Sequence, residues 1–204
     1  MTKNLTRRTA LASGVAGAAT LIAPPLRARE VVEMSKGDAS APIEVVEYAS
    51  FTCPHCASFH TDVYPQIRAN FIETGKVRFV MREVYFDKYG LWAGMLARCG
   101  GEMRYFGIVD MIFVEQNRWL APRPDDRGVI AELFSLGRRA GLTDDQMDAC
   151  MNDQAFAEAL VAEYQRNAEA DIVRGTPSFK VNGRMVSNMG YAEFASVLNA
   201  ELES

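Results

Sequence analysis

The sequence has few of the residues that build metal centres, and it has no long hydrophobic run. Its 204 residues include two histidines, two tryptophans and four cysteines. No segment reaches the roughly 18 apolar residues that a membrane-spanning helix needs, and the chain contains no internal repeat or low-complexity stretch. What remains is ordinary globular composition, 49% hydrophobic and 24% charged, long enough for one domain with a large insertion.

Acidic side chains outnumber basic ones, and the basic ones are unevenly distributed along the chain. The net charge is −4, but residues 1–28 hold four basic side chains and no acidic one, so the remainder carries −8. An acidic body argues against nucleic acid or an anionic membrane surface as the main partner.

The first 28 residues have the layout of a removable signal peptide. A basic start containing Arg7 and Arg8 precedes a weakly apolar stretch over residues 10–23 and the small residue Ala28. The paired arginines favour the twin-arginine route, with the general secretory route as the alternative. We therefore expect a periplasmic protein in which disulfides persist.

The mature part, residues 29–204, begins with a strand–helix–strand pattern. Ile43 to Tyr48 reads as a strand, Pro54 to Glu73 as a helix kinked at Pro65, and Val77 to Val84 as a second strand. Two strands joined through a helix over about 45 residues predict a parallel pair.

Helical spacing then takes over from about 89–173, where Thr143 and Gln146 form a capping box. Strand patterns return at Ser178 to Val181, followed by a hairpin signal at Asn182-Gly183 and a last helix over 191–202. The order predicts a small α/β domain with an inserted α-helical domain.

Two of the cysteines lie in Cys53-Pro54-His55-Cys56, where the first strand gives way to the helix. A thiolate at a helix N-terminus is stabilised by the unpaired N–H groups, and the motif therefore predicts a reactive Cys53. Pro54 suits the first turn, and His55 adds a donor beside the sulfur. Cys56, one turn later, can resolve a mixed disulfide, so we expect the pair to donate disulfides.

Two features outside the motif fit the same chemistry. Glu47, six residues before Cys53, can exchange a proton with Cys56 if it is buried; the alternative is a surface glutamate on an edge strand. Thr176-Pro177 is a site where a cis peptide is affordable and where backbone groups stay free to bind an extended substrate; the alternative is a turn proline.

The segments 47–56, 175–179 and 181–183 together resemble the DsbA family of bacterial periplasmic disulfide oxidoreductases. The resemblance covers roughly residues 31–202. It implies a thioredoxin-like fold with an inserted helical domain and a cis peptide at Thr176–Pro177. It also implies a monomer without a cofactor beyond its own disulfide, acting on unfolded or reduced exported proteins and reoxidised by a quinone-linked membrane partner of the DsbB type.

Carried over residue by residue, the resemblance assigns roles to the motif. Cys53 is the nucleophile and Cys56 the resolving cysteine, His55 stabilises the thiolate, and Glu47 is the buried acid. Pro177 is the cis-proline, which with Thr176 contacts the substrate.

Alternatives remain open. Thr176 departs from the valine of the best-known enterobacterial oxidases and is also found in isomerase-like relatives, so isomerase or reductase activity is one alternative. A chaperone-like binding module is another. His60 stands where those oxidases carry an acid, and no role is assigned to it. A metal site of Cys53, Cys56 and His60 is disfavoured, because no second metal-binding pair is present.

The other two cysteines, Cys99 and Cys150, fall in the helical segment. We predict that they form a structural disulfide, resembling a second bridge in some alphaproteobacterial relatives, with two unlinked buried thiols as the alternative.

Overall fold

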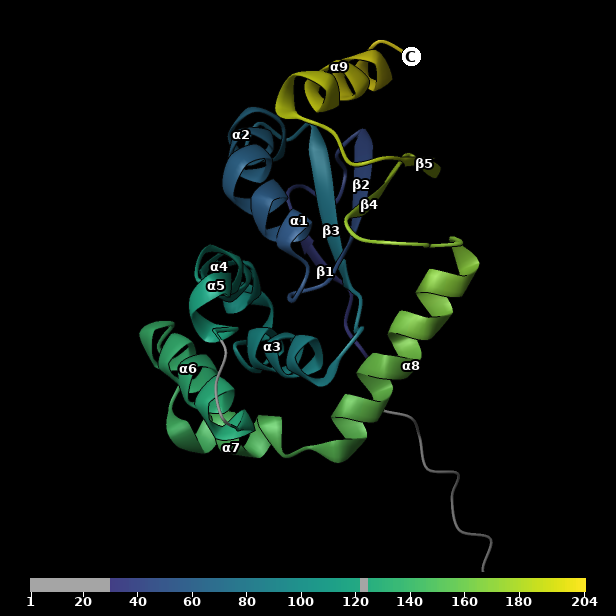
Figure 1. Cartoon of the computed structure of the whole chain (residues 1–204). Coiled ribbons are helices and arrows are strands. Elements are labelled where there is room, and N and C mark those ends of the chain that lie inside the picture. The colour runs from purple at the N-terminus through teal and green to yellow at the C-terminus, as the bar shows by residue number, and fades with distance from the viewer. Residues whose placement is uncertain (1–29, 122–124) are drawn as a thin grey trace, which may run out of the picture.

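The computed structural model describes residues 30–121 and 125–204; the predicted signal peptide lies outside these ranges. The described chain forms a five-stranded sheet, ordered β1-β3-β2-β4-β5, with helices against it (Figure 1). The strands are β1 (Met34–Lys36), β2 (Ile43–Ala49), β3 (Val77–Glu83), β4 (Ser178–Val181) and β5 (Arg184–Val186). The helices are α1 (Pro54–Ser58), α2 (Tyr64–Ile67), α3 (Lys88–Cys99), α4 (Gly101–Val114), α5 (Gln116–Trp119), α6 (Asp126–Arg139), α7 (Asp144–Met151), α8 (Gln154–Ala170) and α9 (Tyr191–Leu202).

The parallel pair predicted from the strand–helix–strand pattern is confirmed. β2 lies parallel to β3, with Ile43 opposite Val77, and β4 is antiparallel to β2 on its other side. The β4–β5 turn is the predicted hairpin: Asn182 and Gly183 both have positive φ, 45° and 84°. This is the twist that a two-residue hairpin requires.

Helices α3 to α8 all lie between β3 and β4 in the chain. In Figure 1, α3 to α7 cluster below α1 and α2, and α8 leads from this cluster back toward β4. The predicted capping box is present at the start of α7, where the Thr143 hydroxyl accepts from the Gln146 N–H and the Gln146 side chain accepts from the Thr143 N–H.

The segment between β2 and β3 differs from the predicted kinked α-helix. Between and after α1 and α2 it contains two π-helical turns, η1 (Phe59–Val63) and η2 (Arg68–Ile72). Pro65 lies in the first turn of α2, directly after η1. Inside a regular α-helix its ring would clash with the preceding turn, and the wider π turn relieves that conflict. The predicted continuous α-helix is therefore interrupted next to Pro65 by a local widening, which also contains His60.

Alternate side chains of β2 face two separate cores. Val45 and Ala49 belong to the main core, built with α1, α2, α4 and α9, whereas Val46 and Tyr48 pack with Tyr164 and Val173 on the other face. By this alternation Glu47 faces the main core.

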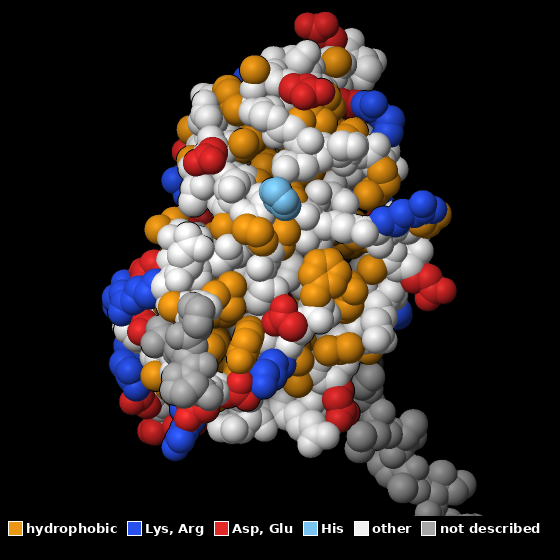
Figure 2. Space-filling model, in the orientation of Figure 1, with side chains coloured by type: hydrophobic (Ala, Val, Ile, Leu, Met, Phe, Trp, Pro, Cys, Tyr) orange, Lys and Arg blue, Asp and Glu red, His pale blue; other side chains and the backbone are white. Residues whose placement is uncertain are grey.

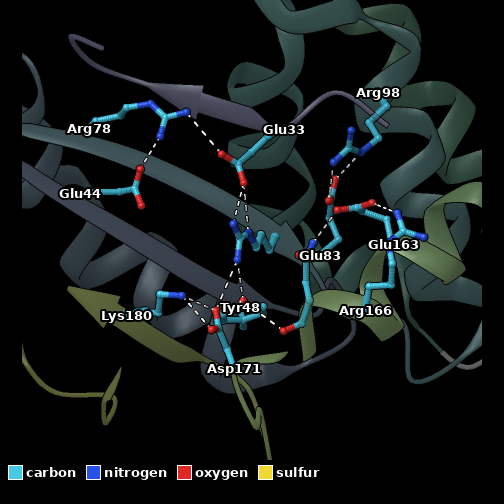
Figure 3. Close-up of polar contacts among 12 residues, drawn as sticks. Glu33, Glu44, Tyr48, Arg78, Glu83, Arg98, Glu163, Arg166, Asp171 and Lys180 are labelled. Atoms are coloured by element: carbon cyan, nitrogen blue, oxygen red, sulfur yellow. Dashed lines mark hydrogen bonds and ion pairs between the residues drawn. The ribbon is translucent and has the colours of Figure 1, made fainter. Parts of the chain in front are cut away.

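On the α8 face of the sheet, a polar network joins the end of α8 to three strands (Figure 3). Asp171, which follows α8, accepts hydrogen bonds from Tyr48 on β2 and from Lys180 on β4, the latter at 2.7 and 2.8 Å. Arg82 on β3 donates to the Tyr48 hydroxyl at 2.8 Å and to Glu33. The network fixes the chain five residues before Thr176, and so helps to position the loop that contains it.

Candidate active site

The loop after β2 places Cys53 as the N-cap of α1. Its backbone is extended (φ −82°, ψ 121°), and Pro54 follows in the first turn, as predicted. The Cys53 N–H donates to the Ser50 carbonyl at 3.1 Å, and its own carbonyl accepts from the Ala57 N–H at 3.2 Å. The Cys53 side chain makes no capping hydrogen bond, so its sulfur stays available at the helix N-terminus.

Gln116, a residue that the sequence analysis did not single out, hydrogen-bonds to the backbone of this loop. Its buried amide Nε2 donates to the carbonyls of Phe51, at 2.8 Å, and Cys53, at 2.9 Å. Gln116 begins α5, and a glutamine in a short helix carries no local signal of this contact. The helical segment thus supplies a structural support of the cysteine loop.

The two motif cysteines are free thiols in very different surroundings. Cys53 is partly exposed, whereas Cys56 is fully buried. The Cys53 thiol donates to the Thr176 carbonyl at 3.3 Å. His55 is exposed beside them.

The Thr176–Pro177 peptide bond is cis, and Pro177 is buried while Thr176 is partly exposed. The Ser178 hydroxyl donates to the Gly175 carbonyl at 2.7 Å and closes the loop. Residues 123 positions apart in sequence, Cys53 and Thr176, are therefore brought into contact.

Glu47 is fully buried on a central strand, which excludes the alternative of a surface glutamate on an edge strand. Its partner is His60, also buried: Nε2 lies 2.8 Å from Glu47 Oε2. The His60 ring stacks on Phe113, with ring centroids 4.2 Å apart. Helical spacing could have suggested that His60 lies on the same face as Cys56, four residues earlier, but it could not have predicted the contact with Glu47.

Burial, reinforced by the charge of Glu47, raises the pKa of the Cys56 thiol well above the ordinary value of 9.0. Below pH 9.0 both folded and unfolded chains keep this proton. Above it the unfolded chain loses a proton that the folded chain retains, so the reduced protein should lose up to about 1.4 kcal/mol of stability per pH unit.

Urea unfolding of the reduced protein at about pH 8 and about pH 10 measures this loss. Cys56→Ala is the matched control, because it keeps every other titrating group. The pH dependence should be smaller in the variant; equal slopes for the two proteins would contradict the assignment.

The remaining cysteines, Cys99 at the end of α3 and Cys150 in α7, form a disulfide.

Among residues 30–121 and 125–204, no three His, Cys, Asp or Glu side chains gather into a group that could hold a metal ion.

Comparison with known proteins agrees with this geometry. The thioredoxin family model matches residues 29–200. The fold is similar to the crystal structure of alpha-DsbA1 from Wolbachia pipientis, with a TM-score of 0.77, 25% identity, and coverage of 90% of this chain and 94% of that one. The chain is a DsbA-like member of the thioredoxin family. The predicted α/β thioredoxin-like fold is thereby confirmed.

Curated relatives of this DsbA-like chain include a Rickettsia bellii protein provisionally named a protein-disulfide oxidoreductase, 33% identical over 172 residues that make up 84% of this chain. Disulfide bond formation protein D of Bacillus subtilis is 24% identical over 178 residues, 82% of this chain and 76% of that protein. The chain spans only 60 to 65% of the length of the rickettsial relatives. None of the helices in the part of the chain that the structure describes is long and apolar enough to cross a membrane.

Proposed function

We propose that this protein is a thiol:disulfide oxidoreductase that donates its Cys53–Cys56 disulfide to exported proteins. The observation that carries the proposal is the asymmetry of the pair: a partly exposed sulfur at a helix N-terminus touches the Thr176 carbonyl, and a fully buried sulfur lies behind it.

This asymmetry separates the two sulfurs by role. In the oxidised protein, a substrate thiolate can reach only Cys53; its attack breaks the Cys53–Cys56 bond and leaves the electron pair on Cys56. A second substrate thiol then attacks the substrate sulfur of the mixed disulfide. The substrate leaves oxidised, and Cys53 and Cys56 remain as the reduced dithiol. No cofactor beyond the disulfide is required.

The neighbouring residues have distinct proposed roles. His55, exposed one residue after Pro54, stabilises the Cys53 thiolate with the helix N-terminus. Glu47, buried near Cys56, exchanges the proton that Cys56 takes up as it leaves.

The surface around the motif suits unfolded segments. Figure 2 shows a histidine on a face where hydrophobic side chains lie around it, with one acidic group below it and many of the other charged groups nearer the margins. Thr176 and Pro177 would bind an extended substrate segment through the backbone beside Cys53. Phe86, 60% exposed, adds apolar surface between β3 and α3.

The cellular setting completes the proposal. Export through the signal in residues 1–28, by the twin-arginine route, would deliver the protein to the periplasm as a monomer. A quinone-linked membrane oxidase of the DsbB type would restore its disulfide.

Equilibration of the Cys53–Cys56 pair with glutathione tests the proposal. A disulfide donor should be more oxidising than the glutathione couple, so the dithiol should dominate when reduced and oxidised glutathione are mixed at a poise near that of thioredoxin, roughly −270 mV. The fraction reduced is read by alkylation and mass spectrometry. A disulfide that persists under those conditions would identify a reductase instead.

A further inference from the structure

We propose that His60 is a positioning residue for the redox chemistry: it holds the Glu47 carboxylate through Oε2 and leaves Oε1 to exchange a proton with Cys56. This proposal rests on the proposed function and deepens it.

Both partners of the Glu47–His60 hydrogen bond are buried. Glu47 is 0% exposed and His60 4%, and the 2.8 Å bond between Nε2 and Oε2 is the hydrogen bond that Glu47 makes through its side chain. Within residues 30–121 and 125–204, Glu47 Oε1 and His60 Nδ1 have no hydrogen-bond partner. A buried carboxylate with a free oxygen is costly unless a nearby cation or donor compensates it, and His60 is the group in contact that can do so.

A second carboxylate lies within electrostatic reach of His60. Asp110 on α4 interacts electrostatically with it and is itself paired with Arg68, at 3.3 Å. Tyr64 on α2 places its ring 4.9 Å from the imidazole, and Cys56 on α1 is close enough to Glu47 to interact with its charge. His60 therefore contacts the Glu47 carboxylate directly and interacts with that of Asp110 at longer range.

The proton movement balances in both directions. When a substrate thiolate attacks Cys53, the S–S bond breaks and Cys56 leaves as a thiolate; a proton passes from Glu47 Oε1 to Cys56, and the carboxylate left behind is stabilised by the N–H of His60. When the disulfide is restored from a mixed disulfide at Cys53, Cys56 returns the proton to Glu47 as its sulfur attacks Cys53. The S–S bond to the oxidant breaks, and the oxidant's sulfur leaves as a thiolate. His60 lies in the π turn η1, so the contact with Glu47 is made from the widened part of the helix.

Two substitutions separate positioning from packing. His60→Phe keeps a ring that can stack on Phe113 but removes the donor to Glu47, and His60→Gln keeps a donor without a charge. Tyr64→Phe is the matched control, because the Tyr64 hydroxyl has no partner among the described residues and its removal leaves the ring in place.

The experiment follows the closure of the Cys53–Cys56 disulfide after Cys53 has been converted to its glutathione mixed disulfide by oxidised glutathione. The wild-type rate should change little with pH near neutrality. In His60→Phe it should be about tenfold lower at pH 7 and should rise with pH, since loss of proton exchange by a general base typically costs 10²- to 10⁴-fold and Glu47 is retained here. His60→Gln should fall between the two, and Tyr64→Phe should match the wild type.

The rate at which Cys53 is alkylated in the reduced proteins should stay within about twofold, because His60 acts on Glu47 and Cys56 and not on Cys53. Identical pH profiles for the wild type and both His60 variants would overturn the role of His60 while leaving the proposed function intact. A wild-type protein that does not close the disulfide at all would instead overturn the proposed function.

Discussion

Cys56→Ser should trap glutathione on Cys53 for at least about a thousandfold longer than the wild type does. In the wild type the second sulfur is held one turn away on α1, and well-oriented intramolecular groups reach effective concentrations of 10⁵ M or more. Serine cannot attack the mixed disulfide, so release must wait for a thiol from solution. Treatment with oxidised glutathione, removal of the excess and mass spectrometry over time measure the lifetime of the adduct.

The reciprocal variant, Cys53→Ser, is the control. It should form no adduct on the same timescale, because Cys56 is fully buried and its raised pKa keeps it a thiol near neutrality. Equal labelling of the two variants would show that the sulfurs do not differ in access, and the proposed division between nucleophile and resolving cysteine would be wrong.

Removing the Cys99–Cys150 bridge should destabilise the protein by about 4 kcal/mol. The bridge closes a loop with a sequence separation of 51 and ties the end of α3 to α7. In the chain-entropy model a loop of this length lowers the entropy of the unfolded chain by that amount. Cys99→Ala/Cys150→Ala should therefore unfold at a markedly lower urea concentration than its parent.

A parent that already carries Cys53→Ala and Cys56→Ala makes this comparison clean, since Cys99 and Cys150 are then the only cysteines left. Adding a reductant to this parent should reproduce the effect of the double substitution. If reductant and substitution both changed the free energy of unfolding by less than about 1 kcal/mol, the bridge would not be restraining the unfolded chain as proposed.

The sequence was informative where local chemistry determines structure. The β2–β3 pair, the Asn182-Gly183 hairpin and the Thr143 capping box all follow from residue spacing and backbone preference, and each is present. The placement of Cys53 at a helix start also follows from the strand pattern before it and from Pro54 after it.

Contacts between residues far apart in the sequence could not be predicted from residue spacing. Glu47 and His60 are 13 residues apart, and Gln116 lies 63 residues from Cys53, so no periodicity connects them. The π turns were also missed, because Pro65 signals only that a regular helix cannot continue and does not say how the neighbouring turns adjust.

Two side chains from beyond β3 support the cysteine loop. Gln116 donates to two of its carbonyls, and Asp87, the N-cap of α3, accepts from the Thr52 hydroxyl at 2.6 Å while also capping the Gly90 N–H. A shortened protein in which β3 is joined directly to β4 would lose these partners together. A shortened version of this chain would need substitute hydrogen-bond donors and acceptors for the loop. Without them, the Cys53–Cys56 motif would keep its sequence but lose the support for its backbone conformation.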